Sequence, residues 1–132
     1  KLKTVELIIT APLAKAYMDT EQLHQVMWNL MENASHYCDE SLDSQPVQVT
    51  LASTGNEISI DISDNGEGVS EKVQKHLFEP FHSKRAGGTG LGLYLARVFC
   101  QANGARLNYL HNEHERCCFR ISIPLNREES VQ

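Results

Sequence analysis

The stretch from Phe78 to Leu95, FEPFHSKRAGGTGLGLYL, changes character halfway along. Its first half predicts a loop with two aromatic residues, a proline and the basic pair Lys84 and Arg85, and its second half is a glycine cluster that runs directly into an apolar helical pattern. A glycine-rich segment at the start of a helix offers unpaired backbone N–H groups and a favourable helix dipole to an anion. A flexible turn before a helix gives the same pattern. The stretch alone therefore leaves a phosphate-binding segment and a simple turn as alternatives.

The composition is that of a single globular domain. The chain has 132 residues, of which 41% are hydrophobic and 22% are charged, so it can bury a core without disulfide bonds or a structural metal. We expect residues 1–132 to form one domain in which residues 126–132 are a frayed polar tail. The chain begins with Lys1 rather than Met, and we expect it to be a fragment of a longer protein.

Charge, hydropathy and cysteine pattern argue against several classes of protein. A net charge of −5 without a basic stripe argues against nucleic-acid binding. There is no apolar run long enough to span a membrane and no signal peptide, so we expect this domain to be cytoplasmic and to make no direct membrane contact. A parent protein anchored in the inner membrane is compatible with this expectation. The four cysteines form no C-x-x-C pair, which argues against structural zinc and favours reduced thiols.

Two hairpins frame the expected sheet. VQVTLAS and EISIDIS both alternate in polarity and are separated by Thr54-Gly55-Asn56, which predicts a hairpin. The second hairpin is expected near the C-terminus, across a polar turn. The predicted strands cover residues 5–10, 14–18, 47–53, 57–63, 106–110 and 117–123, and the predicted helices cover residues 20–38, 71–77 and about 91–102, the last ending at Asn103-Gly104.

The first predicted helix carries two asparagines beside its apolar stripe. Asp19 or Thr20 can cap this helix. Its core stripe consists of Leu23, Val26, Met27, Leu30, Met31 and Ala34. At about 100° per residue, Asn29, Asn33 and His36 fall on one flank of the stripe. Helix interiors disfavour Asn, so a binding role and an ordinary solvated flank are both open on this evidence.

The strand at 57–63 runs directly into Asp64-Asn65-Gly66-Glu67-Gly68. Asp and Gly at the end of a strand normally form a turn. Here the glycines also remove side chains where a flat ligand could approach the backbone. A carboxylate at Asp64 could then accept a hydrogen bond from the amino group of a base.

The stretches NLMENA, DNGEG, FEPF and GGTGLGL follow one another in an order that resembles the catalytic and ATP-binding domain of sensor histidine kinases. That domain belongs to the superfamily of gyrase, Hsp90 and MutL-type ATPases, and the resemblance extends from about Val5 to Pro124. The continuation YLARVFCQANGARL is most similar to kinases of the nitrogen-regulation and pilus-regulation type. Each motif is weak alone, and the four in this order and spacing are specific.

The resemblance implies roles for the residues on the helix flank and the turn. Asn33 matches the asparagine whose amide oxygen is a Mg²⁺ ligand, in keeping with the preference of Mg²⁺ for oxygen donors. Asn29 matches the first asparagine of the same motif, on the phosphate side of the pocket. Tyr37 matches the residue that packs against adenine. Asp64 matches the aspartate that binds the adenine amino group, with Gly66 and Gly68 making room for the base.

The resemblance also implies roles for the segment that follows the turn. Phe78 and Phe81 would anchor a lid over the nucleotide. The residues expected to wrap the phosphates at the start of the helix are Gly88, Thr89, Gly90, Leu91 and Gly92.

Two positions decide what chemistry is expected. His36 stands where these kinases usually have Lys or Arg, and an imidazole is a weaker, pH-dependent phosphate partner. Lys84 or Arg85 could compensate for it. Asn29 stands where the hydrolysing members of the superfamily have a glutamate that activates water, and an amide cannot act as a general base. Glu32 lies near the outward face and is a poor substitute, so efficient hydrolysis is not expected.

The expected fold is a two-layer α/β sandwich with a mixed sheet of about five strands covered on one face by three helices. The expected function is binding of Mg·ATP and presentation of its γ-phosphate to a histidine on a dimerisation domain outside this chain, feeding a response regulator in two-component signalling. The isolated domain is expected to be monomeric. A nucleotide-gated interaction module and a hydrolysing ATPase are the alternatives, and a dinucleotide oxidoreductase is disfavoured because the glycines follow a loop late in the chain.

Overall fold

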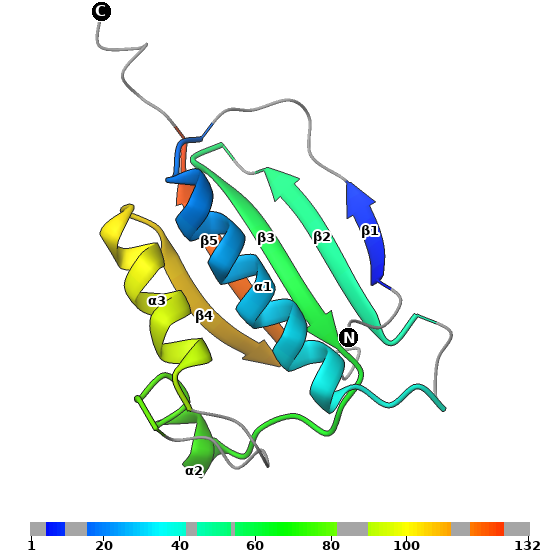
Figure 1. Cartoon of the computed structure of the whole chain (residues 1–132). Helices are drawn as coiled ribbons and strands as arrows, with labels where there is room; N and C mark the ends of the chain where they lie inside the picture. The colour runs from blue at the N-terminus through cyan, green and yellow to red at the C-terminus, as the bar shows by residue number, and fades with distance from the viewer. Residues whose placement is uncertain are drawn as a thin grey trace, which may run out of the picture.

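The computed structural model describes residues 5–9, 16–41, 45–53, 55–81, 90–111 and 117–125. It is a two-layer sandwich in which helices lie over one face of a sheet (Figure 1). In chain order the elements are β1 (Val5–Ile9), α1 (Thr20–Tyr37), β2 (Val47–Ser53), β3 (Glu57–Asp64), α2 (Glu71–Gln74), α3 (Gly92–Ala102), β4 (Arg106–His111) and β5 (Cys117–Pro124).

The sheet has five strands in the order β1-β2-β3-β5-β4. β1 pairs with β2 in parallel, and the other neighbours are antiparallel. The sheet is therefore mixed, as the sequence predicts. The register of β3 and β5 sets Asp64 opposite Cys117 at the end of the sheet where β3 stops. This pair marks the end of the molecule at which α1 ends and α3 begins (Figure 1).

Helix α1 is fixed by a cap and by burial of one stripe. The Asp19 side chain accepts a hydrogen bond of 2.9 Å from the Gln22 N–H, so Asp19 is the N-cap residue. Val26, Leu30 and Ala34 are fully or almost fully buried against the sheet. α3 contributes Ala96 and Cys100 to the same core, and the strands contribute Val47, Val49, Ile62, Leu107, Phe119, Ile121 and Ile123.

The Asn103 side chain connects the end of α3 to the beginning of α1. Its Oδ1 accepts a hydrogen bond of 2.9 Å from the Asp19 N–H, and its Nδ2 donates to Gln22 Oε1 at 2.7 Å and to the Phe99 carbonyl at 2.8 Å. Gly104 follows at φ 72°, the left-handed conformation typical of a helix C-terminus. The predicted stop of α3 at Asn103-Gly104 is thereby confirmed.

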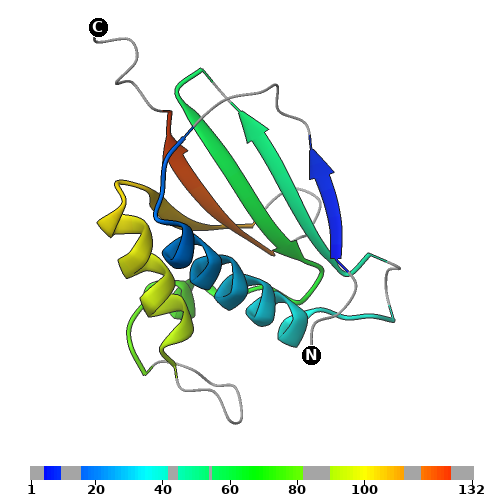
Figure 2. The same cartoon turned by 45° about the horizontal axis from the view of Figure 1, so that its top comes forward.

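The opposite face of the sheet carries paired charges. α1 and α3 lie on the same side of the sheet when the molecule is turned (Figure 2). On the other side, Arg120 contacts both carboxylate oxygens of Asp61 at 2.8 and 2.9 Å, and Arg106 contacts both of Glu57 at 2.9 and 2.7 Å. The hydrogen bond to Asp61 raises the pKa of Arg120, which stays charged. The first pair joins the neighbouring strands β3 and β5, and the second joins β3 to β4 across β5.

Several observed boundaries differ from those predicted from the sequence. The strand expected at 14–18 is reduced, over residues 16–18, to a single bridge between Ala16 and Leu125. The helix expected at 71–77 is helical only over Glu71–Gln74, and it lies beyond the end of the sheet next to α3 (Figure 1). The tail at 126–132 is outside the described residues. Over the ranges described, the helices are either too short or too polar to cross a membrane.

We expect Cys38 to be the most reactive of the four thiols toward alkylating agents. All four cysteines are free, and burial raises the pKa of Cys100 to about 11 and that of Cys118 to about 12. Cys117 is also buried, whereas Cys38 is only partly covered. Because the thiolate is the reactive form, a raised pKa lowers reactivity at neutral pH. Iodoacetamide labelling of the native chain, read by mass spectrometry, should modify Cys38 first, and the Cys38→Ala variant should label slowly until denaturant is added. Rapid native labelling of Cys100 or Cys118 would contradict this core.

Candidate functional site

The two predicted asparagines lie on the flank of α1 that faces α3. The Asn29 Nδ2 donates a hydrogen bond of 3.0 Å to the carbonyl of Gly92, the first residue of α3. Its Oδ1 accepts one of 2.8 Å from Gln25 Nε2, one turn earlier on α1. Asn29 therefore attaches the beginning of α3 to α1, and the helix flank is not a simple solvated surface.

The segment before α3 is closed by a backbone contact. The Phe81 N–H donates a hydrogen bond of 2.8 Å to the Gly90 carbonyl. Phe81 has φ 64°, unusual for a residue with a side chain, and Gly90 has φ 74°. Phe81 is 75% exposed, so its attachment to the segment is made by its backbone.

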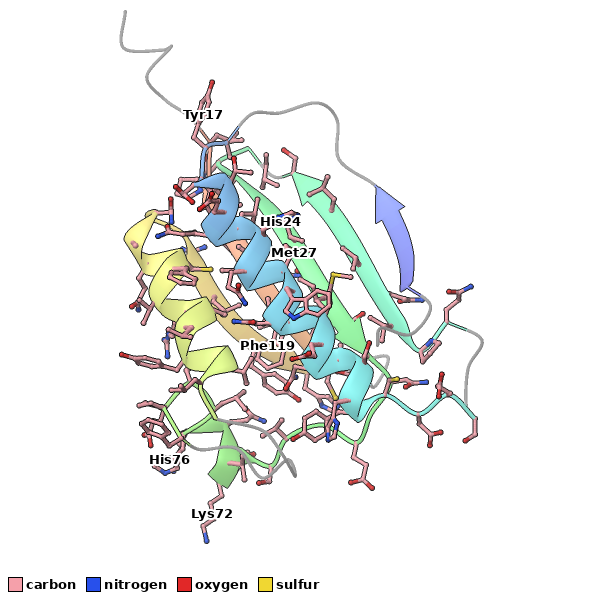
Figure 3. The ribbon with its side chains drawn as sticks, viewed as in Figure 1. Tyr17, His24, Met27, Lys72, His76 and Phe119 are labelled. Carbon is pink, nitrogen blue, oxygen red and sulfur yellow. The ribbon has the colours of Figure 1, made fainter. Side chains whose placement is uncertain are left out.

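Phe78 does pack into the fold. Its ring meets the buried Phe119 ring edge-on, with centroids 5.9 Å apart, and the Arg97 guanidinium of α3 lies 4.7 Å from its centroid. Figure 3 shows Phe119 near the end of the sheet at which α3 begins, whereas Lys72 and His76 project outward from the α2 region. Phe78 is thus the residue that holds the start of the predicted lid.

Asp64 and Gly66 form the predicted turn at the end of β3. Asp64 is only 4% exposed, and its Oδ1 accepts a hydrogen bond of 2.7 Å from the Gly66 N–H. A Cβ on Gly66 would collide with the Tyr37 carbonyl oxygen and lie 2.8 Å from Asp64 Oδ1. A side chain is therefore excluded at Gly66 by the end of α1, and this contact places the turn directly beside Tyr37.

Asn65 joins the same turn to the chain that leaves α1. Its Oδ1 accepts a hydrogen bond of 2.7 Å from the Asp39 N–H, and its Nδ2 donates one of 2.9 Å to the Asp39 carbonyl. Tyr37 is 48% exposed and meets the His36 ring edge-on at 4.7 Å, so both side chains lie at the surface where α1 ends. The turn at 64–66 is thus held to the C-terminal end of α1.

Gly68 lies over residues of the last two strands. It has φ 91°, and a Cβ there would lie 3.4 Å from Cys117 Sγ and 3.5 Å from the Tyr109 hydroxyl. That hydroxyl accepts a hydrogen bond of 3.1 Å from the Val69 N–H. Burial raises the pKa of Tyr109 above its ordinary value, and a hydrogen bond with the Cys117 side chain adds to this shift. The phenol is therefore neutral under physiological conditions.

The donor set fits a magnesium ion that takes most of its ligands from phosphate and water. Asn33 lies half-buried between Asn29 and Tyr37 on α1, and its side chain makes no hydrogen bond to another described residue. Within the described ranges, no three His, Cys, Asp or Glu side chains gather as a metal site. An amide oxygen with an open coordination side suits Mg²⁺, which keeps several waters and is commonly held with substrate phosphates.

The start of α3 suits an anion. Leu91 is the N-cap residue, and no side chain caps the helix among the described residues. The first N–H groups of a helix and its dipole favour negative charge. The hydrogen bond from Asn29 to the Gly92 carbonyl brings this segment, Gly90 to Gly92, beside α1. Lys84, Gly88 and Thr89, the other residues predicted for phosphate, lie outside the described residues.

Sequence reasoning missed Asn65, Tyr109 and Cys117. Asn65 stands inside a motif that was examined for its aspartate and glycines, and an Asx residue before glycine is a signal for side-chain hydrogen bonding to nearby backbone. Tyr109 and Cys117 fall on the core face of their strands, where the alternating pattern predicts only packing. No pattern in the sequence shows that their polar atoms reach a distant turn.

The family of the chain follows from residues 18–127, which match the family described as histidine kinase-, DNA gyrase B- and HSP90-like ATPase. The chain belongs to this family, and the resemblance seen in its motifs is confirmed. The sensor protein kinase PilS of Pseudomonas aeruginosa is 37% identical over 115 residues, which are 86% of this chain and 22% of PilS. The chain thus spans a minor part of that relative, and further relatives are also named histidine kinases.

Solved structures confirm the fold. The nucleotide-free catalytic domain of the histidine kinase ThkA superimposes with a TM-score of 0.75 at 21% identity, over 91% of this chain and 80% of that one. Full-length ShkA in complex with AMPPNP gives a TM-score of 0.75 at 21% identity, over 92% of this chain and 25% of ShkA. At this identity the likeness concerns the arrangement of the elements.

We expect Gly66→Ala to lower the free energy of unfolding by about 1–3 kcal/mol, because the added methyl group must displace the Tyr37 carbonyl or the Asp64 carboxylate. Gly55→Ala is the matched control: a Cβ there meets nothing within 4 Å, and its effect should stay within about 0.5 kcal/mol. Urea unfolding measures both. Equal stabilities of the two variants would show that the turn is not pressed against α1.

Proposed function

We propose that the chain binds Mg·ATP between α1, the turn at 64–68 and the start of α3, and presents the γ-phosphate to a histidine of a dimerisation domain. The base lies at the end where Asp64, Gly66 and Tyr37 meet. The phosphates lie along the flank of α1 toward Gly90, Leu91 and Gly92.

One observation carries the proposal: α1 contacts both predicted subsites. Asn29 binds the Gly92 carbonyl, and the Tyr37 carbonyl covers Gly66. At about 1.5 Å per residue, Tyr37 lies roughly 12 Å along the helix axis from Asn29, with Asn33 midway. That span suits one extended nucleoside triphosphate with a metal ion near its tail. The two subsites therefore serve one ligand.

Asp64 is suited to recognise adenine. Its Oδ1 accepts a hydrogen bond from the Gly66 N–H, which fixes the orientation of the carboxylate. A carboxylate has lone pairs for several hydrogen bonds, so Asp64 can also accept one from an amino group on the base. Gly66 and Gly68 have no side chains to obstruct a flat ring. An amino group donates to a carboxylate, whereas the carbonyl of guanine in the same position would be repelled.

Residues of the α1 flank hold the phosphate end. Asn33 supplies an oxygen ligand to Mg²⁺, and Asn29 positions the first turn of α3. The metal ion, when bound, neutralises phosphate charge during transfer. The N–H groups at the start of α3 bind phosphate oxygens. His36 and Lys84 are the proposed side-chain partners of the phosphates. The exposed Phe81, which lies close to Lys84 in sequence, is proposed to contact the nucleotide as well.

Phosphoryl transfer is favoured over hydrolysis. The Asn29 amide cannot accept a proton from water, and both ends of the amide are engaged, with Gln25 and with Gly92. Glu32, the nearest acid along α1, is exposed. In phosphoryl transfer to a histidine the catalytic domain mainly positions and neutralises, so no general base on this chain is required.

The partners follow from the family. PilS and other relatives are sensor kinases, and this chain spans only part of their length. We therefore propose a phosphoacceptor and dimerisation domain of the same kinase and a response regulator as partners, with this domain monomeric by itself and placed in the cytoplasm. A second candidate function is a nucleotide-gated interaction module that transfers no phosphate. It is favoured by the exposed His36, which stands where these kinases usually have Lys or Arg.

We expect Asp64→Asn to weaken ATP binding by about 1.5–3 kcal/mol, as for loss of a charge-assisted hydrogen bond. Asn keeps an acceptor for the Gly66 N–H, so the turn is preserved. The difference between the affinities for ATP and for GTP should become smaller. Asp61→Asn, on the same strand but the opposite face, should leave ATP affinity unchanged. Titration calorimetry of both nucleotides measures this. Equal affinities of the wild type for ATP and GTP would count against the role of Asp64 in recognising the base.

Phosphotransfer is tested by mixing the chain with the dimerisation domain of its parent kinase, Mg²⁺ and γ-labelled ATP. We expect acid-labile phosphohistidine on the dimerisation domain, and its rate should fall at least about tenfold in Asn33→Ala, as for loss of a metal ligand. Ser41→Ala, in the loop after α1, is the control. Normal ATP binding without phosphohistidine would favour the interaction module, and rapid release of inorganic phosphate by the chain alone would favour a hydrolase.

A further inference from the structure

The Tyr109 side chain reaches from β4 to the turn that follows β3. Its ring packs on Phe119 of the neighbouring strand, with centroids 5.2 Å apart at 61°. Its hydroxyl accepts the Val69 N–H at 3.1 Å, across 40 residues of sequence. A buried phenol needs a hydrogen-bond partner, and here the partner is a backbone group of the turn.

Cys117 of β5 continues this contact. Cys117 and Tyr109 lie on the same face of neighbouring strands, two positions apart in the register, and both side chains lie against Gly68. The Cys117 thiol in turn donates to the Gly66 carbonyl at 3.4 Å, a distance suited to sulfur. The pair therefore touches the turn at two backbone groups, one on each side of Gly68.

The backbone groups determine the direction of both hydrogen bonds to the turn. The Val69 N–H can only donate, so the Tyr109 oxygen accepts, and the Gly66 carbonyl can only accept, so the Cys117 thiol donates its proton. The thiol can make this contact only while it is protonated, and burial keeps the Tyr109 phenol neutral as well.

We propose that Tyr109 and Cys117 are positioning residues for nucleotide recognition: they hold residues 66–69 in place so that the Gly66 N–H orients the Asp64 carboxylate. The inference rests on the proposed function, because the turn is the base subsite only if the chain binds ATP. Gly66 and Gly68 have no side chains that could hold the turn, and the contacts of Asn65 and of α1 concern only its first half. The Tyr109–Cys117 pair supports the second half from beneath.

The test compares Tyr109→Phe, Cys117→Ala and Cys117→Ser with Tyr17→Phe in the 132-residue chain. Tyr17 is 64% exposed and lies at the opposite end of the molecule (Figure 3). The first readout, without nucleotide, is hydrogen exchange of the Val69 amide by NMR. The second is the affinity for ATP and for GTP by calorimetry.

We expect Tyr109→Phe and Cys117→Ala to speed Val69 exchange and to weaken ATP binding roughly three- to tenfold, as for one lost neutral hydrogen bond, while narrowing the ATP-to-GTP preference. Cys117→Ser keeps a donor and an acceptor and should lie nearer the wild type than Cys117→Ala. The effects of the two changes on ATP affinity should not add fully in the double variant, since both contacts hold the same short turn. Tyr17→Phe should change neither readout.

Two outcomes separate this inference from the proposed function. If the wild type binds ATP and Tyr109→Phe keeps the same ATP affinity and the same ATP-to-GTP preference, the inference alone is overturned, even if exchange of the Val69 amide becomes faster. Unchanged Val69 exchange in Tyr109→Phe would also overturn it, because the turn would not be held by the phenol. No ATP binding by the wild type would overturn the proposed function, and the positioning role with it.

Discussion

The burial of one stripe of α1 sets the rotation of that helix, and the site depends on this rotation. The residues of this stripe that face the sheet are Val26, Leu30 and Ala34, so the flank with Asn29 and Asn33 faces α3. The last residue of the helix, Tyr37, then lies over Gly66. A rotation by one residue, about 100°, would bury an amide and turn the binding flank away from α3. Core packing and ligand geometry are therefore fixed by the same apolar contacts.

Neutral amides make the long-range connections around this helix. Asn29 joins α1 to α3, Asn65 joins the base turn to the chain after α1, and Asn103 joins the end of α3 to the N-cap of α1. An amide can donate and accept at once and costs less to desolvate than a charge. The two arginine–carboxylate pairs, Arg120 with Asp61 and Arg106 with Glu57, lie instead on the face of the sheet away from α1 and α3, so these charges do not compete with an anionic ligand on the helix side.

The sequence allowed prediction of the features that have a period or a local signal. The strands at 47–53 and 57–63 alternate, α1 has a cap and a stripe, and Asn103-Gly104 ends α3, so these elements were found at nearly their observed bounds. The helix predicted at 71–77 is longer than the observed one, because the helix that follows Ser70 buries none of its residues and packing does not extend it. Tyr109 and Cys117 were missed because alternation gives the face of a strand residue but not the distant backbone group that its polar atom meets.

The backbone contact between Phe81 and Gly90 has a consequence for how this domain can vary. It fixes both ends of the intervening stretch within one hydrogen bond of each other, whatever its length. The entropic cost of closing a loop grows only with the logarithm of its length, about 0.6 kcal/mol for each doubling. Changes in the length of this interval should therefore cost little free energy of unfolding, so its length can vary in evolution while the fold on either side keeps its geometry. The residues within it that are proposed for phosphate, Lys84, Gly88 and Thr89, remain constrained by the ligand.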